Sequence, residues 1–400
     1  MNKLIACGIF ASALLLSPFQ AQAKQEPMKK VVDHGLKAST EQAILMAKSL
    51  EDKPGRVPMT ISKDGKFETS TYSWWCSGFF PGELWYLYEA NPTPEMKRYA
   101  EMYTARVEKA ASITYSHDVG FMVNCSFGNG YRLTGNPQYK EVMLRGAKSL
   151  ATRYNKKLGV IRSWDFNRQK WQFPVIIDNM MNLEFFCEVS KLTGDNTYRD
   201  MAISHANRTL QNHFRPDYSC YHVVSYDTIT GNPHVKQTHQ GYADNSAWAR
   251  GQAWALYGYT MMYRETGKPE YLAQAKHVAA YLMNHPKMPA DKVPYWDFDD
   301  PAIPNTPRDA SSAAIMASAL IELSQVDKSP EAKSYLKYAE QQVRSLTSPA
   351  YLAKKGQNCN FALMHSTGNK PGDSEVDVPL TYADYYYVEA LVRLKKLYKK

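Results

Sequence analysis

The sequence predicts an all-α protein folded as an (α/α)6 barrel, which is a closed ring of six helical hairpins. The first observation is a segment that recurs along the chain. It reads Leu-Thr-Gly-Asn-Pro-Gln-Tyr at 133–139, with close copies at 192–198 and 265–271 and weaker ones beginning at 91 and 327. Glycine fits the left-handed position that ends a helix, and proline fits the first turn of the next one. Each copy therefore predicts a tight turn between two helices.

The second observation is that the helices on the two sides of these turns differ. The segments before the turns are apolar nearly all round and rich in aromatic, methionine and small residues, as buried helices are. These six inner helices are expected at 78–90, 118–133, 176–193, 247–266, 309–326 and 381–397. Six outer helices with a polar face are expected at 33–50, 94–112, 138–154, 198–214, 269–284 and 331–346.

An open solenoid is the alternative arrangement for such hairpins, and it needs polar repeats to cap its two ends. The sequence contains no convincing capping repeat, which favours closure of the ring. It also contains no linker. We therefore expect a single domain over residues 24–400.

The N-terminus predicts export. Residues 1–23 have the pattern of a signal peptide, with Lys3 at the start, an apolar stretch at 4–16 and the small-x-small site Ala21-Gln22-Ala23. A lipoprotein signal is the alternative, but Cys7 comes too early for an apolar stretch to precede it. We expect a bacterial periplasm as the destination and no membrane span in the mature chain.

The amino-acid composition and charge limit the classes of molecule that the protein is expected to bind. The chain has 400 residues, 44% hydrophobic and 22% charged, so it is not a disordered protein. The formal net charge is +9 with scattered basic residues, which favours an acidic polysaccharide over nucleic acid. Five cysteines follow the signal peptide without a C-x-x-C motif, and this odd number predicts small buried side chains, although one pair could still bridge.

Motifs of several other chemistries are missing. The sequence has no G-x-S-x-G elbow, no H-E-x-x-H and no EF-hand loop. His234 and His239 flank a loop and could bind a metal, but no carboxylate has a matching spacing. Neither a metal nor another cofactor is expected.

Function is expected at the end of the barrel opposite the tight turns, where longer loops lead into the inner helices. Those loops are rich in tryptophan, tyrosine, histidine and aspartate, whose aromatic faces and planar polar groups suit sugar rings. The groups lie at 72–75, 115–118, 163–165, 248–254, 295–299, 307–309 and 382–386. Each group alone is more typical of core packing, but their repeated position at the starts of inner helices favours a carbohydrate site.

Three aspartates stand at these starts: Asp118, Asp178 and Asp309. An aspartate there is usually an N-cap, which is the interpretation kept for Asp309. Asp178 differs because it lies between an apolar run and two methionines, so that burial should raise its pKa, as a general acid requires. Asn182, one turn further along the same face, is within reach of a hydrogen bond to Asp178. Asp118 and Asp178 lie on neighbouring hairpins and are expected to converge on one pocket.

At these positions the sequence resembles glycoside hydrolase family 88, the unsaturated glucuronyl hydrolases. The resemblance runs across essentially the whole mature chain, and its motifs are specific only in combination. They are Trp75-Cys-Ser-Gly78-Phe-Phe-Pro-Gly82-Glu-Leu-Trp85, His117-Asp118-Val-Gly-Phe121, Ile177-Asp178-Asn-Met-Met-Asn182, Trp248-Ala-Arg250-Gly-Gln252-Ala-Trp254, Tyr295-Trp-Asp297-Phe and Arg308-Asp309-Ala-Ser-Ser. The family has the (α/α)6 barrel, in agreement with the hairpin count.

The resemblance implies an oligosaccharide substrate left by a polysaccharide lyase. Its non-reducing uronic acid carries a 4,5 double bond conjugated to the ring oxygen, and the enzyme hydrates this enol ether. The separation between carboxylates that distinguishes retaining from inverting glycosidases therefore does not apply. By the resemblance, Asp178 is the general acid and base, and Asp118 is a second acid that assists it and holds the sugar hydroxyls.

The resemblance also assigns substrate-binding residues. They are Trp75 and Trp164 as aromatic walls, His117 beside the second acid, Arg250, Gln252 and Trp254 on the opposite side of the pocket, and His222 near the uronate. Because the loop after His222 varies in length, His234 and His239 stay as alternatives to it.

The segment 365–370 suggests an anion site independently of the resemblance. Gly368 frees backbone amides, Ser366 and Asn369 donate hydrogen bonds, and Lys370 adds positive charge, a combination that suits a sulfate on the next sugar. A flexible surface turn is the alternative interpretation.

Three other functions compete with this one. An unsaturated rhamnogalacturonyl hydrolase would use the same chemistry on pectin fragments, and His117-Asp118 together with the Trp75-x-x-Gly78-Phe motif discriminates against it. A polysaccharide lyase would create double bonds instead of consuming them. A non-catalytic glycan-binding protein would have no need of two buried aspartates, which cost stability.

Overall fold

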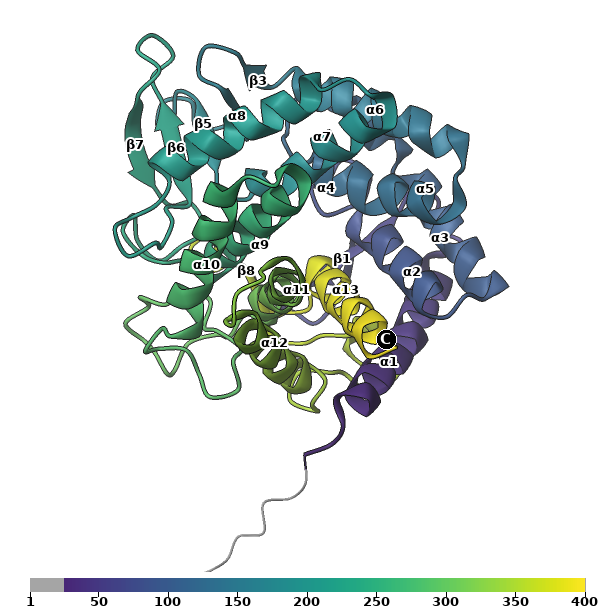
Figure 1. Ribbon diagram of the computed structural model, residues 1–400. Helices are drawn as coiled ribbons and strands as arrows, with labels where there is room; N and C mark the ends of the chain where they lie inside the picture. The colour runs from purple at the N-terminus through teal and green to yellow at the C-terminus, as the bar shows by residue number, and fades with distance from the viewer. Residues whose placement is uncertain (1–24, 400) are drawn as a thin grey trace, which may run out of the picture.

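The computed structural model describes residues 25–399, and these residues form a closed ring of helical hairpins (Figure 1). The (α/α)6 barrel is confirmed. The signal peptide predicted at 1–23 lies outside the described residues. In the part of the chain from 25 to 399, no helix is both long enough and apolar enough to cross a membrane.

Six helical segments form the inner ring. Five of them are single helices: α2 (Phe79–Ala90), α7 (Asn179–Thr193), α9 (Ala249–Thr266), α11 (Ala310–Val326) and α13 (Thr381–Tyr398). The sixth, which follows α2 in the ring, consists of α4 (Val119–Val123), the π-helical turn η2 (Asn124–Gly128) and α5 (Asn129–Thr134). Each packs against the next, and α13 packs against α2, so that the ring is closed. As expected for buried helices, every residue of α11 from Ala310 to Ile321 is buried.

The outer ring consists of helices that bury one face. They are α1 (Met28–Leu50), α3 (Pro94–Arg106) with the short 3-10 helix η1 (Glu108–Ser112), α6 (Pro137–Ala151), α8 (Thr197–Asn212), α10 (Pro269–Met283) and α12 (Ala332–Leu346). In α12 the buried residues Tyr335, Ala339 and Val343 recur every four residues, which is the spacing of one helix face. The first and last helices, α1 and α13, lie side by side where the ring closes (Figure 1).

The tight turns between inner and outer helices have the predicted geometry in three hairpins. Gly135, Gly194 and Gly267 follow α5, α7 and α9 with φ of 66°, 74° and 68°, in the left-handed region. The two weaker copies lack such a residue, because Asn91 and Asp327 end their helices with extended backbone. We call this end of the barrel the turn end and the other the loop end.

The loop end carries short antiparallel strands that were not predicted. They are β1 (Val57–Ile61) with β2 (Phe67–Ser70), β3 (Tyr154–Asn155) with β4 (Val160–Ile161), the sheet of β5 (Pro174–Ile176), β6 (Val223–Tyr226) and β7 (Pro233–Gln237), and β8 (Ser366–Asn369) with β9 (Ser374–Val378). Because β5 pairs with β6, α7 begins at Asn179 and not at the predicted position 176.

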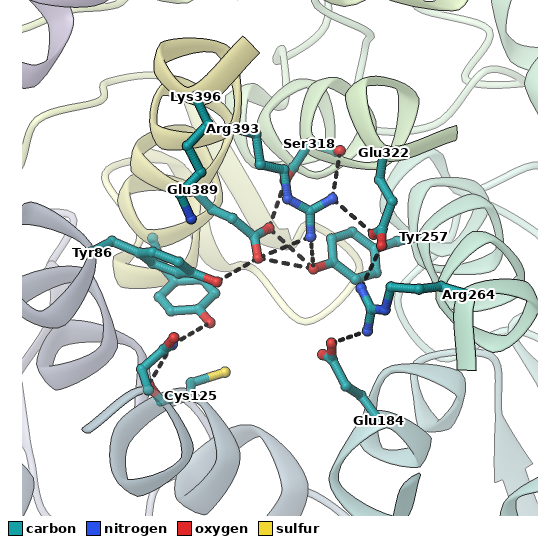
Figure 2. A network of polar contacts seen from close by, with 12 residues as sticks. Tyr86, Cys125, Glu184, Tyr257, Arg264, Ser318, Glu322, Glu389, Arg393 and Lys396 are labelled. Atoms are coloured by element: carbon teal, nitrogen blue, oxygen red, sulfur yellow. Dashed lines mark hydrogen bonds and ion pairs between the residues drawn. The ribbon is translucent and has the colours of Figure 1, made fainter. Parts of the chain in front are cut away.

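A network of ion pairs holds the inner helices together at the turn end (Figure 2). Arg264 of α9 pairs with Glu184 of α7 and Glu322 of α11, and Arg393 of α13 pairs with Glu322 at 2.8 Å and Glu389 at 3.2 Å. Three hydroxyl groups donate to Glu389; they belong to Tyr86 of α2, Tyr257 of α9 and Ser318 of α11. The network therefore joins five of the six inner segments.

The cysteines behave as the sequence predicted. Cys76, Cys125, Cys187 and Cys220 are buried, Cys359 is partly buried, and all five are free. The four buried ones belong to the main apolar core and fill space there as small side chains.

Candidate active site

The candidate site is a cavity of about 480 Å³ at the loop end. Its walls come from loops of different hairpins, at residues 73–75, 115–118, 164–166, 176, 178, 239–240, 250 and 369. A larger cavity of about 710 Å³ lies at the turn end, but its charged side chains pair with one another. The loop-end cavity contains an acid without a partner, and the chemistry is therefore placed there.

Asp178 is that acid. It stands between β5 and α7 and is 9% exposed, and its Oδ2 atom has no hydrogen-bond partner. Burial raises the pKa of Asp178 to about 7, while Arg250 opposes the rise and Asp118 adds to it. At neutral pH the group is therefore present in both protonation states, as a residue that gives and takes one proton must be.

Asp118 lines the same cavity, as predicted, and is held by its neighbours in the chain. Its Oδ2 accepts a hydrogen bond from Ser116 Oγ at 2.5 Å, and its Oδ1 lies 3.3 Å from His117 Nε2. The predicted convergence of Asp118 and Asp178 on one pocket is confirmed.

Asn182 does not bond Asp178, so that expectation was wrong. Its Oδ1 accepts from the Phe121 backbone N–H at 2.9 Å, and its Nδ2 lies 3.4 Å from His117 Nδ1. Gly120 permits this approach, because a Cβ there would lie 2.4 Å from Asn182 Oδ1. Asn182 lies on the side of α7 that packs against α4, and there it accepts a hydrogen bond from a backbone N–H group of α4.

This contact fixes the state of His117. Since Asn182 presents its amide nitrogen, His117 Nδ1 accepts and the ring proton is on Nε2, facing Asp118. His117 is buried, and burial lowers its pKa. The neutral imidazole thus lies against Asp118, with its Nε2 atom 3.3 Å from the carboxylate.

Arg250 connects three elements beneath the cavity. It is buried at the start of α9 between the rings of Trp248 and Tyr382. Its guanidinium donates to the carbonyl oxygens of Thr367 and Gly368 in β8 and pairs with Asp309 at 3.4 Å. It therefore fixes the β8–β9 hairpin against the barrel.

Asp309 has the N-cap role predicted for it. Its side chain accepts from the backbone N–H of Ser311, the second residue of α11. Besides the pair with Arg250, it accepts from the hydroxyl groups of Ser311 and Ser312 and from the Thr367 backbone N–H.

Two predicted aromatic walls line the cavity. Trp75 packs against Phe121 at 5.8 Å and Tyr382 at 4.9 Å between ring centres. Trp164 packs against Trp171 and His239 at 5.5 and 5.4 Å. The two tryptophans come from different hairpins and line the cavity together.

Several predicted site residues lie behind the cavity wall and do not line it. Gln252 is buried and bonds both backbone groups of Cys220, and Trp254 is buried against Phe121 and Tyr386. Gln252 follows Arg250 by two residues of α9, and Trp254 lies one helical turn beyond Arg250, deeper in the core.

The structure separates the three histidines considered for the uronate contact. His222 is buried against Trp248, and its Nδ1 accepts from the backbone N–H groups of His239 and Gln240. Its Nε2 has no partner, but of the three candidates for the uronate contact only His239 lines the cavity. His234 is exposed on β7.

The predicted anion segment is a hairpin strand, not a flexible turn. Ser366 is buried in β8 with an unpartnered Oγ, and Lys370 follows the strand. Lys370 Nζ lies 3.2 Å from Asp300 and over the ring of Trp296. Only Asn369 of this segment lines the cavity.

Sequence reasoning missed other lining residues. Trp74 and Tyr115 belonged to the aromatic loop groups but were not singled out, whereas Phe166 and Gln240 carried no signal. Among residues 25–399, no group of three or more His, Cys, Asp or Glu side chains is placed to hold a metal ion.

The closed barrel and a loop-end pocket of carboxylates and aromatic rings are the features of a glycoside hydrolase. Comparison with known proteins makes this specific. The model of Glycosyl Hydrolase Family 88 matches residues 46–396, and the chain belongs to this family.

Characterised relatives and solved structures agree. The chain is 51% identical over 327 residues to an unsaturated glucuronyl hydrolase of Formosa agariphila, covering 82% of this chain and 81% of the relative. It is 33% identical to an unsaturated chondroitin disaccharide hydrolase of Streptococcus pyogenes, covering 85% and 86%. A crystal structure of an unsaturated glucuronyl hydrolase specific for heparin superposes with a TM-score of 0.88 at 46% identity, covering 92% and 98%.

Proposed function

We propose that this chain is an unsaturated glucuronyl hydrolase. It would release the 4,5-unsaturated uronic acid from the non-reducing end of glycosaminoglycan oligosaccharides produced by lyases. The observation that carries the proposal is the buried, unpartnered carboxyl group of Asp178 in the loop-end cavity. The names of the relatives, which act on unsaturated glucuronyl or chondroitin disaccharide substrates, support it.

The proposed reaction is a hydration. Asp178 gives its proton to C4, the π electrons of the C4–C5 double bond form the new C–H bond, and positive charge is shared by C5 and the ring oxygen. Water adds to C5 and returns a proton to Asp178. The hemiketal then opens by cleavage of the bond from C5 to the ring oxygen, and the hemiacetal formed at C1 expels the remaining oligosaccharide.

Asp118 is proposed to bind the sugar hydroxyls next to the reacting carbon. The hydrogen bond from Ser116 and the contact with the His117 ring support this, because they hold the carboxylate in one orientation. Its negative charge would also stabilise the positive charge that develops at C5. Trp75 and Trp164 would hold the faces of the sugar.

The test follows the ultraviolet absorbance of the conjugated double bond with lyase-generated disaccharides of chondroitin, heparin and hyaluronan. A falling absorbance is expected. No change with any of the three, followed by turnover of pectin-derived fragments, would indicate a rhamnogalacturonyl hydrolase. A rising absorbance on intact polymers would indicate a lyase.

Replacing the proton donor tests the mechanism. Asp178→Asn should lower kcat by about 100-fold or more and leave binding of the disaccharide nearly unchanged. Glu184→Gln is the matched control, because burial raises the pKa of Glu184 to about 7 as well, on the same helix but in the turn-end cavity. Glu184→Gln should retain activity, and an active Asp178→Asn would refute the assignment.

We further propose export to a periplasm. Lys3, the apolar stretch at 4–16 and Ala21-Gln22-Ala23 support it. A mature chain that begins at Lys24, measured by mass spectrometry of the protein from its native cell, is the expected result.

A further inference from the structure

The rim of the active-site cavity is unusually rich in exposed aromatic rings. Among residues 25–399, seven large hydrophobic side chains are exposed, and three of them line this cavity: Trp74 at 37%, Tyr115 at 54% and Phe166 at 46%. The cavity floor at His117 and Asp178 is buried. The exposed rings therefore surround the mouth, outside the reacting groups.

Tyr115 and Phe166 belong to different loops, which are fastened to each other. The buried Arg153 donates to the Thr114 carbonyl oxygen at 2.7 Å and to Asp165 at 2.9 Å. The backbone of His117 donates to the Ser163 carbonyl oxygen at 3.1 Å. The residues before Tyr115 and before Phe166 are thus tied to one guanidinium, and the two rings are carried on one preorganised unit.

The ring of Phe166 is held in a defined orientation. It stacks on Trp164 with ring centres 4.6 Å apart and planes at 26°, and it also contacts His239 at 5.5 Å. Trp164 therefore covers one face of Phe166, and the residue is still 46% exposed. An open, fixed aromatic face packs well against the C–H groups of a sugar ring.

The same loop carries positive charge. Arg168 is largely exposed, and Lys170 lies over the ring of Trp171. Residues 162–170 contain three cations and one acid, Asp165. This loop would attract the carboxylate and sulfate groups of an anionic sugar chain.

We propose that Tyr115 and Phe166, with Arg168 and Lys170 beside them, form an additional sugar subsite at the cavity mouth. It binds the second disaccharide unit of a longer anionic oligosaccharide. The unsaturated sugar must reach Asp178 at the floor, so the rest of the chain leaves through the mouth and passes these rings. This inference rests on the proposed function and names its preferred substrate length.

The experiment compares kcat/KM for an unsaturated disaccharide and an unsaturated tetrasaccharide of the same polymer. The wild-type protein should prefer the tetrasaccharide by about tenfold, which corresponds to a stacking contact of ordinary strength. Phe166→Ala and Tyr115→Ala should each remove most of this preference, because they should lower kcat/KM for the tetrasaccharide more than for the disaccharide. Phe166→Tyr, which keeps the ring, should retain it.

Tyr398→Ala is the matched control, because Tyr398 is similarly exposed but stands at the turn end of α13. It should leave both rates unchanged. Equal rates on the two substrates in the wild-type protein, or equal losses on both in Phe166→Ala, would overturn the subsite. If the wild-type protein turned over neither substrate, the proposed function would be overturned instead, so the two failures are distinguishable.

Discussion

The carboxyl group of Asp178 links stability to pH. Its pKa is about 3.8 in an ordinary environment and burial raises it to about 7 in the folded protein. Between these values the unfolded chain loses a proton that the folded chain keeps, so stability falls as pH rises from about 4 to 7. Above pH 7 the loss is complete, and below pH 4 the two states bind the proton equally.

Asp178→Asn removes this titration. The difference in Tm between the variant and the wild-type protein should therefore increase in favour of the variant by about 2–5 °C as pH rises from 4 to 7. At higher pH this difference should stay constant. Thermal denaturation across this range measures it. Parallel curves for the two proteins would show that the Asp178 carboxyl group is not buried in its acid form.

Flanking residues were enough to predict burial at Asp178 but not its contacts. The apolar run before it and the methionines after it indicated the environment correctly. The hydrogen-bond partner of Asn182 belongs to another hairpin. There Gly120 permits a close approach, and the Phe121 backbone N–H lies 2.9 Å from Asn182 Oδ1. His222 and His239 could not be separated either, because the β6–β7 pairing decides which ring faces the cavity.

At the scale of elements, the β8–β9 hairpin places the predicted anion segment beside the active site. Arg250 donates hydrogen bonds to two carbonyl groups of β8, and Lys370, which follows β8, forms an ion pair with Asp300. A sulfate on the second sugar would compete with Asp300 for the ammonium group. We expect Lys370→Ala to lower kcat/KM for sulfated disaccharides by about fivefold and for unsulfated ones by less than twofold.

Parallel assays on both substrates measure this effect. Lys396→Ala is the control, since Lys396 pairs with Glu89 at the turn end. Equal losses on sulfated and unsulfated substrates would assign Lys370 to the structure of the hairpin alone.

The elements were predictable where their signals are local. A glycine and a proline within a few residues specify a turn, and the turns after α5, α7 and α9 were found in this way. The strands of the loop end were not found, because they are two to five residues long. For β5 the partner is also distant, because Ile176 pairs with Val223 of β6, and a periodic pattern cannot indicate a partner so far along the chain. The other strands pair with a neighbour close in the sequence.

At the scale of the whole molecule, the barrel separates two polar regions. The loop end contains an acid that is buried without a partner, which costs stability and provides chemistry. The turn end contains partly buried charges that are paired across four inner helices. The repeat predicted the ring, but it could not indicate this network, whose members stand on α7, α9, α11 and α13 at unrelated positions in the sequence.

The turn-end network is expected to support ring closure and not the reaction. Arg393→Met leaves the carboxylates of Glu322 and Glu389 with fewer buried partners, and should cost about 3 kcal/mol of unfolding free energy. Denaturant unfolding measures this cost, and Arg145→Met, which removes an exposed pair with Glu108, should cost less than about 0.5 kcal/mol. Because Arg393 lies at the opposite end of the inner helices from Asp178, kcat/KM per folded molecule should stay unchanged. A loss of activity without a loss of stability would mean that the two ends of the barrel are coupled through the inner helices.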